Sequence, residues 1–414
     1  MESDPKTVLG HLNQDRVIEL TRDILRIPSF SGQEKDVAEH LAARMDDLGM
    51  EVTLQEVQDG RPNVIGVLRG SGGGQSILFN GHMDHNMVCE GWTKDPFGAV
   101  IEDGWLYGIG VANMKAGDAA CLAAVEAIKR SGIRRRGDVT LEFVVGELQG
   151  GIGTLRAIEA GVRADMFIDA EPTELGILTM HAGVVQARIH VLGEMRHFTT
   201  LSGRVVHAIE KMVAVMNALG RSYTPIPHGG WLTFDPKPEY EGLPQLNIGV
   251  IRGGITKDYL AWRPSLVPDR CSITVDIRIV PGQSPESVRR DLSRLLSRLR
   301  ENDPDLNVEL EMLSPEEHAY MPPFEVSRNS YIVQSARRAH LEVFGEEPQV
   351  GGLSPQKYCG SDAAHLAAAG IPGILYGPGG KYLSRPDERV ELAAIYSAAR
   401  VYALVAAEAC VLPK

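Results

Sequence analysis

The feature that most constrains this chain is a short apolar run that ends in a histidine and an aspartate. Ile77, Leu78 and Phe79 lead through Asn80 into Gly-His-Met-Asp at 81–84. The run predicts a buried strand, which puts the histidine at the strand's carboxyl end. The aspartate two residues later can orient the imidazole, as in many metal-ligating histidines. Taken alone, the motif also fits a loop histidine that merely follows a strand.

Two more apolar runs end in acidic residues. Residues 138–145 are rich in β-branched side chains and lead to Glu147, and residues 166–169 lead to Glu171. Residues 114–130, rich in Ala and Leu at helical spacing, predict a crossover helix between parallel strands. Open α/β sheets place their sites at the carboxyl ends of strands, which is where these runs deliver the carboxylates of Glu147, Asp169 and Glu171.

The remaining periodicity predicts a discontinuous core domain. From residue 184 the pattern changes to alternating strands and amphipathic helices, which indicates an inserted α+β domain of ferredoxin-like type. The expected fold class is α/β, with a mixed, largely parallel sheet flanked by helices. The expected domains are a catalytic domain at 1–183 and 314–414 and an inserted dimerisation domain at 184–313. Helices are expected at 14–26, 32–49, 114–130, 205–219, 285–300 and 392–410, and strands at 51–57, 63–68, 76–80, 138–145, 166–169, 184–192 and 272–280.

Composition excludes several classes of partner. The formal net charge of −12 over 414 residues argues against nucleic acid, because phosphate binding needs clustered Lys and Arg. The first residues show neither an apolar signal core nor a basic leader, and no long apolar run predicts a membrane span. The five cysteines are scattered without paired spacing, which favours reduced thiols. We therefore expect a cytoplasmic protein with a small-molecule substrate.

The ordered motifs resemble those of the aminoacylase, acetylornithine deacetylase and succinyl-diaminopimelate desuccinylase superfamily of metallohydrolases, peptidase family M-20. They run in order along nearly the whole chain. They comprise the GHMD segment at 81–84, WTKDPF at 92–97, MK at 114–115, GELQGGIGT at 146–154, EPT at 171–173, DIRIVPG at 276–282, GSDA at 360–363 and GPGG at 377–380. The resemblance implies the fold given above, a divalent metal centre and a hydrolase that cleaves C–N bonds.

The resemblance also implies site residues, and the sequence departs from the family at three ligand positions. His82 matches a ligand, Asp84 the residue that orients it, Glu147 the general base and Glu171 a further ligand. Asn113 stands where the family has a bridging Asp, Leu148 replaces a ligating Glu, and Ser384 replaces a ligating His. Leucine cannot coordinate, and amide or hydroxyl oxygens are weaker ligands than carboxylate or imidazole. We therefore predict one weakly bound Mn²⁺ or Zn²⁺ on His82, Asn113 and Glu171, with His85, Asn86 or Asp169 as substitute ligands.

Further site residues are implied in the inserted domain. His197 matches a histidine that, in the family, crosses a dimer interface to reach the developing oxyanion. Asn247 and Arg278 match substrate-binding positions, and Arg278 can clamp a carboxylate in bidentate fashion. A structural ion pair is the alternative for Arg278. We expect Ser384 to line the substrate site and the inserted domain to pair two chains in a homodimer or an assembly of dimers.

Three functions remain open from the sequence. The first is hydrolysis of a C–N bond in a small carboxylate-bearing substrate by Glu147-activated water, specifically 5-nitroanthranilate-type deamination, in which the aromatic ring carries the charge. The second is the ordinary deacylation of an N-acyl amino acid or dipeptide. The third is a metal-free biosynthetic enzyme or a non-catalytic binding homologue. The altered ligand positions favour the first.

Overall fold

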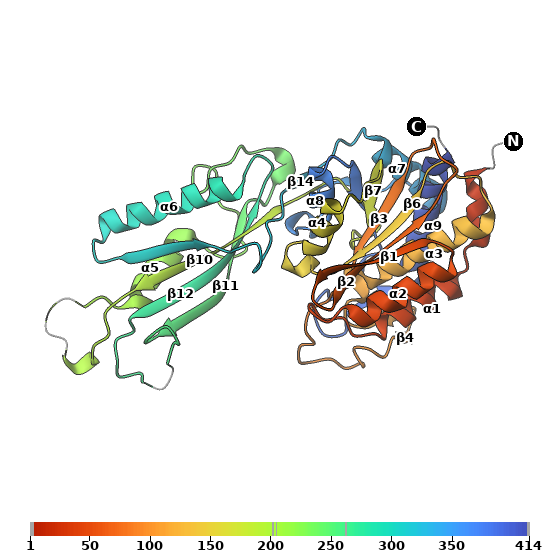
Figure 1. Cartoon of the computed structure of the whole chain (residues 1–414). Helices are drawn as coiled ribbons and strands as arrows, with labels where there is room; N and C mark the ends of the chain where they lie inside the picture. The colour runs from red at the N-terminus through yellow and green to blue at the C-terminus, as the bar shows by residue number, and fades with distance from the viewer. Residues whose placement is uncertain (1–3, 201–202, 204, 261–262, 412–414) are drawn as a thin grey trace. The chain divides into compact units, whose positions relative to one another are not determined.

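The computed structural model describes residues 4–200, 203, 205–260 and 263–411, and the chain divides into two compact units. Unit 1 comprises residues 1–181, 324–357 and 361–414, and unit 2 comprises 182–323 and 358–360 (Figure 1). The expected return to the core domain at 314 is ten residues early. Val184 N donates to Met321 O at 2.9 Å within unit 2, so the chain returns only at Phe324.

Unit 1 is built on an eight-stranded sheet in the order β1-β2-β6-β3-β7-β16-β8-β15. Its central pairs, β6 with β3, β3 with β7 and β7 with β16, are parallel, whereas β1, β2 and β6 pair antiparallel. This confirms the mixed, largely parallel sheet. The strands are β1 Glu51–Gln58, β2 Arg61–Leu68, β3 Ile77–His82, β6 Val139–Val144, β7 Met166–Asp169, β8 Ile177–Leu178, β15 Val350–Gly351 and β16 Gly373–Leu375.

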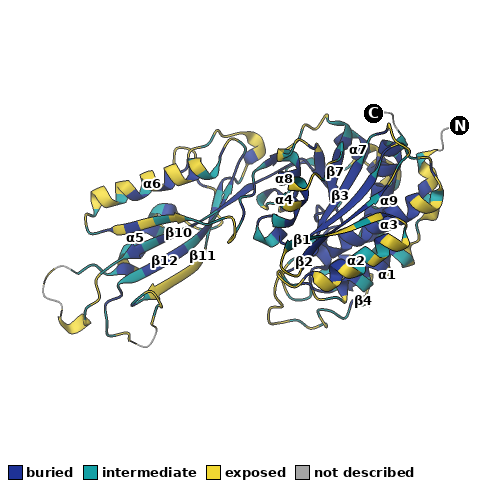
Figure 2. Cartoon of the chain, in the orientation of Figure 1, coloured by how far each residue is buried: buried dark blue, intermediate teal, exposed yellow. Residues whose placement is uncertain are grey.

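The central strands are buried on both faces because helices cover both sides of the sheet. On β3, Ile77 and Phe79 join the larger hydrophobic core, whereas Leu78 between them joins a second cluster. On β7, Phe167 likewise joins the second cluster, opposite to Ile168. Side chains alternate between faces along a strand, so these continuous apolar runs match a sheet covered on both sides (Figure 2).

The helices of unit 1 begin and end close to the predicted positions, and the structure adds others. The predicted ones are α1 Gln14–Leu25, α2 Lys35–Asp47, α3 Ala116–Ser131 and α9 Leu392–Val411, and the added ones are α4 Ile152–Glu159, α7 Tyr331–Phe344 and α8 Ala363–Ala368. Helix α9 has the length and composition of a membrane span, yet 67% of its most apolar window is buried inside the structure. It packs against α3 and α7 as the core helix of this unit.

Smaller elements complete unit 1. They are the 3₁₀ helices Pro5–His11, Glu147–Gln149 and Gln356–Tyr358, the irregular turn Val111–Lys115, in which Asn113 and Met114 are not helical, the pair β9 Met180–His181 with β14 Phe324–Glu325, and the sheet of β4 Val100–Glu102, β5 Trp105–Tyr107, β17 Gly380–Lys381 and β18 Arg389–Glu391.

Unit 2 has the predicted ferredoxin-like topology. Along the chain it runs β10 Gly183–Leu192, α5 Ala208–Leu219, β11 Gln245–Gly254, β12 Arg270–Ile279, α6 Pro285–Asn302 and β13 Asn307–Met312, with 3₁₀ turns at Phe198–Thr200 and Pro238–Tyr240. The four strands form an antiparallel sheet in the order β11-β12-β10-β13. Helix α6 starts with a capping box in which Ser284 and Ser287 satisfy each other's backbone N–H groups. The β-α-β-β-α-β order confirms the inserted α+β fold.

A buried ion pair joins Glu34, just before α2, to Arg61 at the start of β2 in unit 1. Arg61 at the start of β2 donates through Nε to Glu34 Oε2 at 2.8 Å, and both side chains are almost fully buried. Arg61 also donates to Gln149 Oε1 at 2.7 Å, in the turn that carries Glu147. The pair therefore supports the sheet and the turn at Glu147–Gln149 together.

We expect the Glu34→Gln substitution to lower the free energy of unfolding by about 3 kcal/mol, because it leaves the Arg61 guanidinium buried without its counter-charge. Urea denaturation followed by circular dichroism measures this. Glu39→Gln is the matched control, since Glu39 pairs with Lys35 on the surface and such pairs contribute less than about 1 kcal/mol. Equal effects of the two substitutions would contradict the expectation.

Candidate metal centre

Three neighbouring parallel strands bring the predicted residues together. The centre of the sheet runs β6-β3-β7, with Asn80 of β3 level with Glu142 of β6 and Asp169 of β7. His82 ends β3, Glu147 lies in the turn after β6, and Glu171 follows β7 by two residues. Gly146, at φ 71°, makes the left-handed turn that brings Glu147 back over the strand ends.

The three side chains form one buried cluster. A ring nitrogen of His82 and one carboxylate oxygen each from Glu147 and Glu171 all lie within 4.8 Å of one another. His82 Nε2 is 3.5 Å from Glu171 Oε1 and 3.2 Å from Asn113 Oδ1. The structure thus places two of the three predicted ligands, Asn113 and Glu171, beside the third, His82, with the predicted base Glu147 in the same cluster.

The electrostatics of the cluster favour a cation. Burial, with the neighbouring carboxylates, raises the pKa of Glu147 well above its ordinary value. Burial alone lowers the pKa of His82, but Glu171, Glu147 and Asp84 outweigh it and raise that pKa well above 6.5. The protein therefore favours positive charge at the imidazole. One imidazole with two carboxylates is also a typical donor set for a catalytic divalent ion, so these residues fit a metal.

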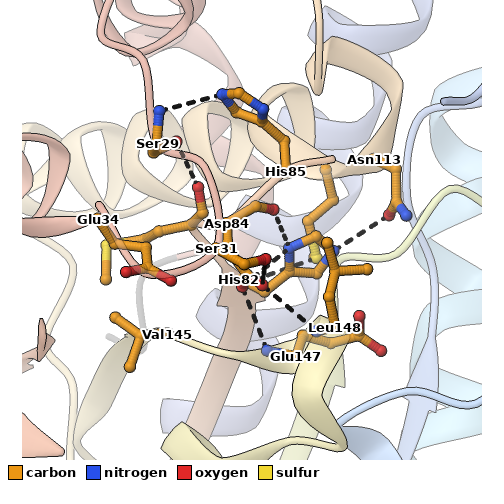
Figure 3. Close-up of polar contacts among 12 residues, drawn as sticks. Ser29, Ser31, Glu34, His82, Asp84, His85, Asn113, Val145, Glu147 and Leu148 are labelled. Atoms are coloured by element: carbon orange, nitrogen blue, oxygen red, sulfur yellow. Dashed lines mark hydrogen bonds and ion pairs between the residues drawn. The ribbon is translucent and has the colours of Figure 1, made fainter. Parts of the chain in front are cut away.

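The sequence predicted that the Asp84 carboxylate orients the His82 ring, but this carboxylate makes no hydrogen bond to the ring. His82 Nδ1 lies 2.8 Å from the main-chain oxygen of Asp84, whereas its carboxylate Oδ1 is 3.7 Å away. The carboxylate instead accepts hydrogen bonds from the backbone N–H groups of Glu147 and Leu148, at 3.2 and 3.3 Å, and from Ser31 Oγ at 2.9 Å (Figure 3). Asp84 therefore orients the ring through its backbone and the Glu147 turn through its side chain.

His85 and Asp169, considered as substitute ligands, are engaged elsewhere. His85 Nδ1 lies 2.8 Å from Asn86 O, and its Nε2 accepts from Ser29 N at 3.0 Å. Burial lowers the pKa of His85 to about 4, so the ring is neutral with both nitrogens in use. Asp169 accepts from Ala363 N at 3.2 Å.

Beside His82 lies a pocket that contains the altered ligand positions. It is lined by His82, Asp84, His85, Asn86, Ile109, Gly110, Asn113, Leu148, Ser384 and Glu388. Asn113, Leu148 and Ser384 all belong to this set, so the side chains that replace the family's ligands gather beside the metal cluster. The metal set His82, Asn113 and Glu171 and the substrate role of Ser384 stay predictions consistent with this geometry.

Sequence reasoning missed Ser31 and Glu388. Ser31 lies in the IPSFSGQE segment at 27–34, which carries no predicted role in the site, and only the fold brings it to Asp84. Glu388 is 1% exposed and accepts hydrogen bonds from the backbone N–H groups of Ala112, Asn113 and Ser384. Its place four residues after Ser384 was the available signal.

The predicted residues of unit 2 are described within that unit only. His197 is exposed, with Nδ1 2.8 Å from Thr199 Oγ1, and its ring stacks on Phe198. Arg278 forms a two-pronged ion pair with Asp276, at 2.7 and 3.2 Å, so the structure matches the structural alternative considered for this residue. Asn247, on β11, is level with Asp276 on β12. Their substrate and catalytic roles stay predictions.

We expect Ser31→Ala to weaken divalent metal binding about tenfold, because Asp84 loses a hydrogen-bond donor and holds the Glu147 turn less firmly. Competition with a chelating dye measures the affinity. Ser71→Ala is the control, since Ser71 makes a comparable hydrogen bond, to Arg135 O, at the exposed edge of the unit. Unchanged affinity in Ser31→Ala would show that the Asp84 bond does not support the site.

Comparisons with known proteins agree over most of the chain. A model described as peptidase family M20/M25/M40 matches residues 78–408. N-formyl-4-amino-5-aminomethyl-2-methylpyrimidine deformylase of Halalkalibacterium halodurans is 27% identical, covering 90% of this chain and 89% of its own. Succinyl-diaminopimelate desuccinylase 2 of Ruegeria sp. is 28% identical, covering 93% of each. A dipeptidase structure from Saccharomyces cerevisiae aligns with a TM-score of 0.81 at 14% identity, covering 100% of both chains. These findings confirm the predicted metallohydrolase superfamily: the chain belongs to peptidase family M20/M25/M40.

Proposed function

We propose that this protein hydrolyses the amide bond of a small N-formyl or N-acyl amine. The observation that carries the proposal is the buried cluster of His82, Glu147 and Glu171, whose ligand atoms lie within 4.8 Å of one another. The deformylase and desuccinylase relatives, which match nearly the full chain, support an acyl group as the part removed.

The residues of the cluster have distinct tasks. His82, Glu171 and the Asn113 amide oxygen would hold one divalent ion, Mn²⁺ or Zn²⁺. When bound, such an ion lowers the pKa of a water and polarises the acyl oxygen. Glu147 removes a proton from the water while the water oxygen attacks the acyl carbon. The C–N bond then breaks, and Glu147 returns the proton to the leaving amine, which gives a carboxylic acid and an amine. The raised pKa of Glu147 suits a group that must both accept and donate a proton.

The comparisons do not support the aromatic aminohydrolase expected from the sequence. The relatives named above are a deformylase and a desuccinylase, and they favour the alternative of ordinary acyl-amide hydrolysis. The inference toward a nitroaromatic amine assumed that an eroded site could not support a tetrahedral oxyanion. Polar side chains in the pocket beside His82 weaken that assumption.

We expect wild-type protein with Mn²⁺ or Zn²⁺ to release amine from N-formyl or N-acetyl substrates, and Glu147→Gln to lower kcat at least 1,000-fold through loss of the base. Amine release, followed with a fluorogenic amine reagent, measures this. Metal content by mass spectrometry should stay at one ion per chain in Glu147→Gln and fall in His82→Ala. Two tightly bound ions, or turnover that survives Glu147→Gln, would contradict the proposal.

We further propose that the protein is a homodimer joined through unit 2. Strand β11 lies at an edge of its sheet, and its Val250 and Ile251 are 46% and 55% exposed. On α5 of the same unit, Ile209 and Val213 are 37% and 51% exposed (Figure 2). An unpaired strand edge beside exposed apolar side chains is a typical surface for a second copy.

We expect light scattering after gel filtration to give a mass twice that of one chain. Ile251→Asp should shift the measured mass toward that of a single chain, because a buried carboxylate without a partner opposes association. Leu54→Asp is the control, since Leu54 is 47% exposed on β1, the edge strand of unit 1. A monomer mass for wild type, or dissociation by Leu54→Asp alone, would disprove the proposed interface.

A further inference from the structure

Two hydrogen-bond donors beside His82, the Asn113 amide N–H and the Ser384 hydroxyl hydrogen, have no acceptor among the described residues. Asn113 and Ser384 line the same pocket as His82, and they stand where the family has metal ligands. We propose that Asn113 Nδ2 and Ser384 Oγ form an oxyanion site, which binds the acyl oxygen as it becomes negative. This inference rests on the proposed amide hydrolysis and names the groups that replace the support of a second ion.

The orientation of the Asn113 amide follows from His82. His82 Nδ1 donates to the main-chain oxygen of Asp84, so Nε2 is the nitrogen that faces Asn113 and Glu171. Asn113 Oδ1 lies 3.2 Å from that Nε2, so the oxygen of the amide faces the ring. The Nδ2 group therefore points away from His82 and makes no hydrogen bond with the described residues (Figure 3).

The Ser384 hydroxyl is oriented by Asn86. Asn86 Nδ2 donates to Ser384 Oγ at 2.8 Å, so the oxygen of this hydroxyl acts as acceptor in that bond. A hydroxyl has one hydrogen, and that hydrogen remains available for another acceptor. Because Ser384 lines the pocket beside His82, an acyl oxygen bound there can take this hydrogen bond.

One buried carboxylate fixes both donors. Glu388 Oε1 accepts from Ala112 N at 2.8 Å and Asn113 N at 3.3 Å, and its Oε2 accepts from Ser384 N at 3.2 Å. Glu388 is thus a positioning residue that ties two segments, some 270 residues apart in sequence, to a single side chain. Preorganised donors of this kind stabilise a transition state because they need no rearrangement as charge develops.

The chemistry of the donors matches the proposed reaction. Attack of water on the acyl carbon moves an electron pair onto the acyl oxygen, and N–H and O–H groups stabilise that charge without becoming ionised. The apolar Leu148 lines the same pocket, and a less polar wall strengthens such hydrogen bonds. Each preorganised donor typically contributes about 100-fold to kcat.

The test compares Asn113→Asp and Ser384→Ala with wild type on an N-formyl amine. Asn113→Asp keeps an oxygen that faces His82 but replaces the Nδ2 donor by an oxygen and adds a negative charge. We therefore expect kcat to fall at least about 100-fold while one ion stays bound at least as tightly. Ser384→Ala should lose about 100-fold in kcat with unchanged metal content. The control is Asn329→Asp, an exposed asparagine in unit 1 far from the pocket in sequence, which should keep wild-type kcat.

A binding readout separates transition-state from ground-state effects. In a Glu147→Gln background, which blocks turnover, calorimetric Kd for the N-formyl amine should change less than about fivefold on adding Asn113→Asp. Full kcat in Asn113→Asp or Ser384→Ala, or a loss explained wholly by Kd, would overturn the oxyanion site and leave amide hydrolysis standing. A wild type that hydrolyses no N-formyl or N-acyl amine would instead remove the proposed function, and the oxyanion site with it.

Discussion

The structure depends on carboxyl groups that are buried around the carboxyl ends of β6, β3 and β7. Glu147, Asp169 and Asp362 are at most 8% exposed, and burial raises the pKa of each carboxyl group. Burying carboxylates without a counter-charge costs several kcal/mol each, which protonation or a nearby cation offsets. The positive charge that Glu171, Glu147 and Asp84 favour at His82 therefore bears on the stability of the fold as well as on the site.

Two carboxylates, that of Asp84 and that of Glu388, hold the loops of the candidate site in place through backbone hydrogen bonds. Asp84 binds the backbone N–H groups of Glu147 and Leu148, and Glu388 binds those of Ala112, Asn113 and Ser384. Each carboxylate thus organises a loop by accepting several backbone hydrogen bonds, as the end of a helix or a turn often requires. The loops that carry Glu147, Asn113 and Ser384 are therefore positioned by main-chain contacts, which do not depend on the side chains at those three positions.

Sequence reasoning found the strands and their terminal residues because both are local. Apolar runs such as Ile77–Phe79 and the residues directly after them, His82 among them, follow from periodicity and from the place of sites in α/β sheets. It did not find the Ser31 bond to Asp84, which joins residues 53 apart, or the Glu388 bonds to Asn113 and Ala112. Those contacts depend on tertiary packing. The Asp84 error has the same origin, since spacing alone cannot tell whether a carboxylate or a main-chain oxygen faces the ring.

The replacements at positions 113, 148 and 384 change which groups would stabilise negative charge on an acyl oxygen in the proposed reaction. A bridging carboxylate and a second imidazole would hold another cation near the acyl oxygen, whereas Asn113 and Ser384 offer uncharged N–H and O–H groups at the same place. Neutral donors stabilise an oxyanion less than a divalent ion does, but they need no rearrangement as the charge develops. Leu148 supplies no ligand atom, so less negative ligand charge surrounds His82 than in a site with two ions, and one ion can balance it. The proposed use of one ion and two fixed donors would thus differ from a two-ion site in relying on hydrogen bonds that are oriented before the reaction begins.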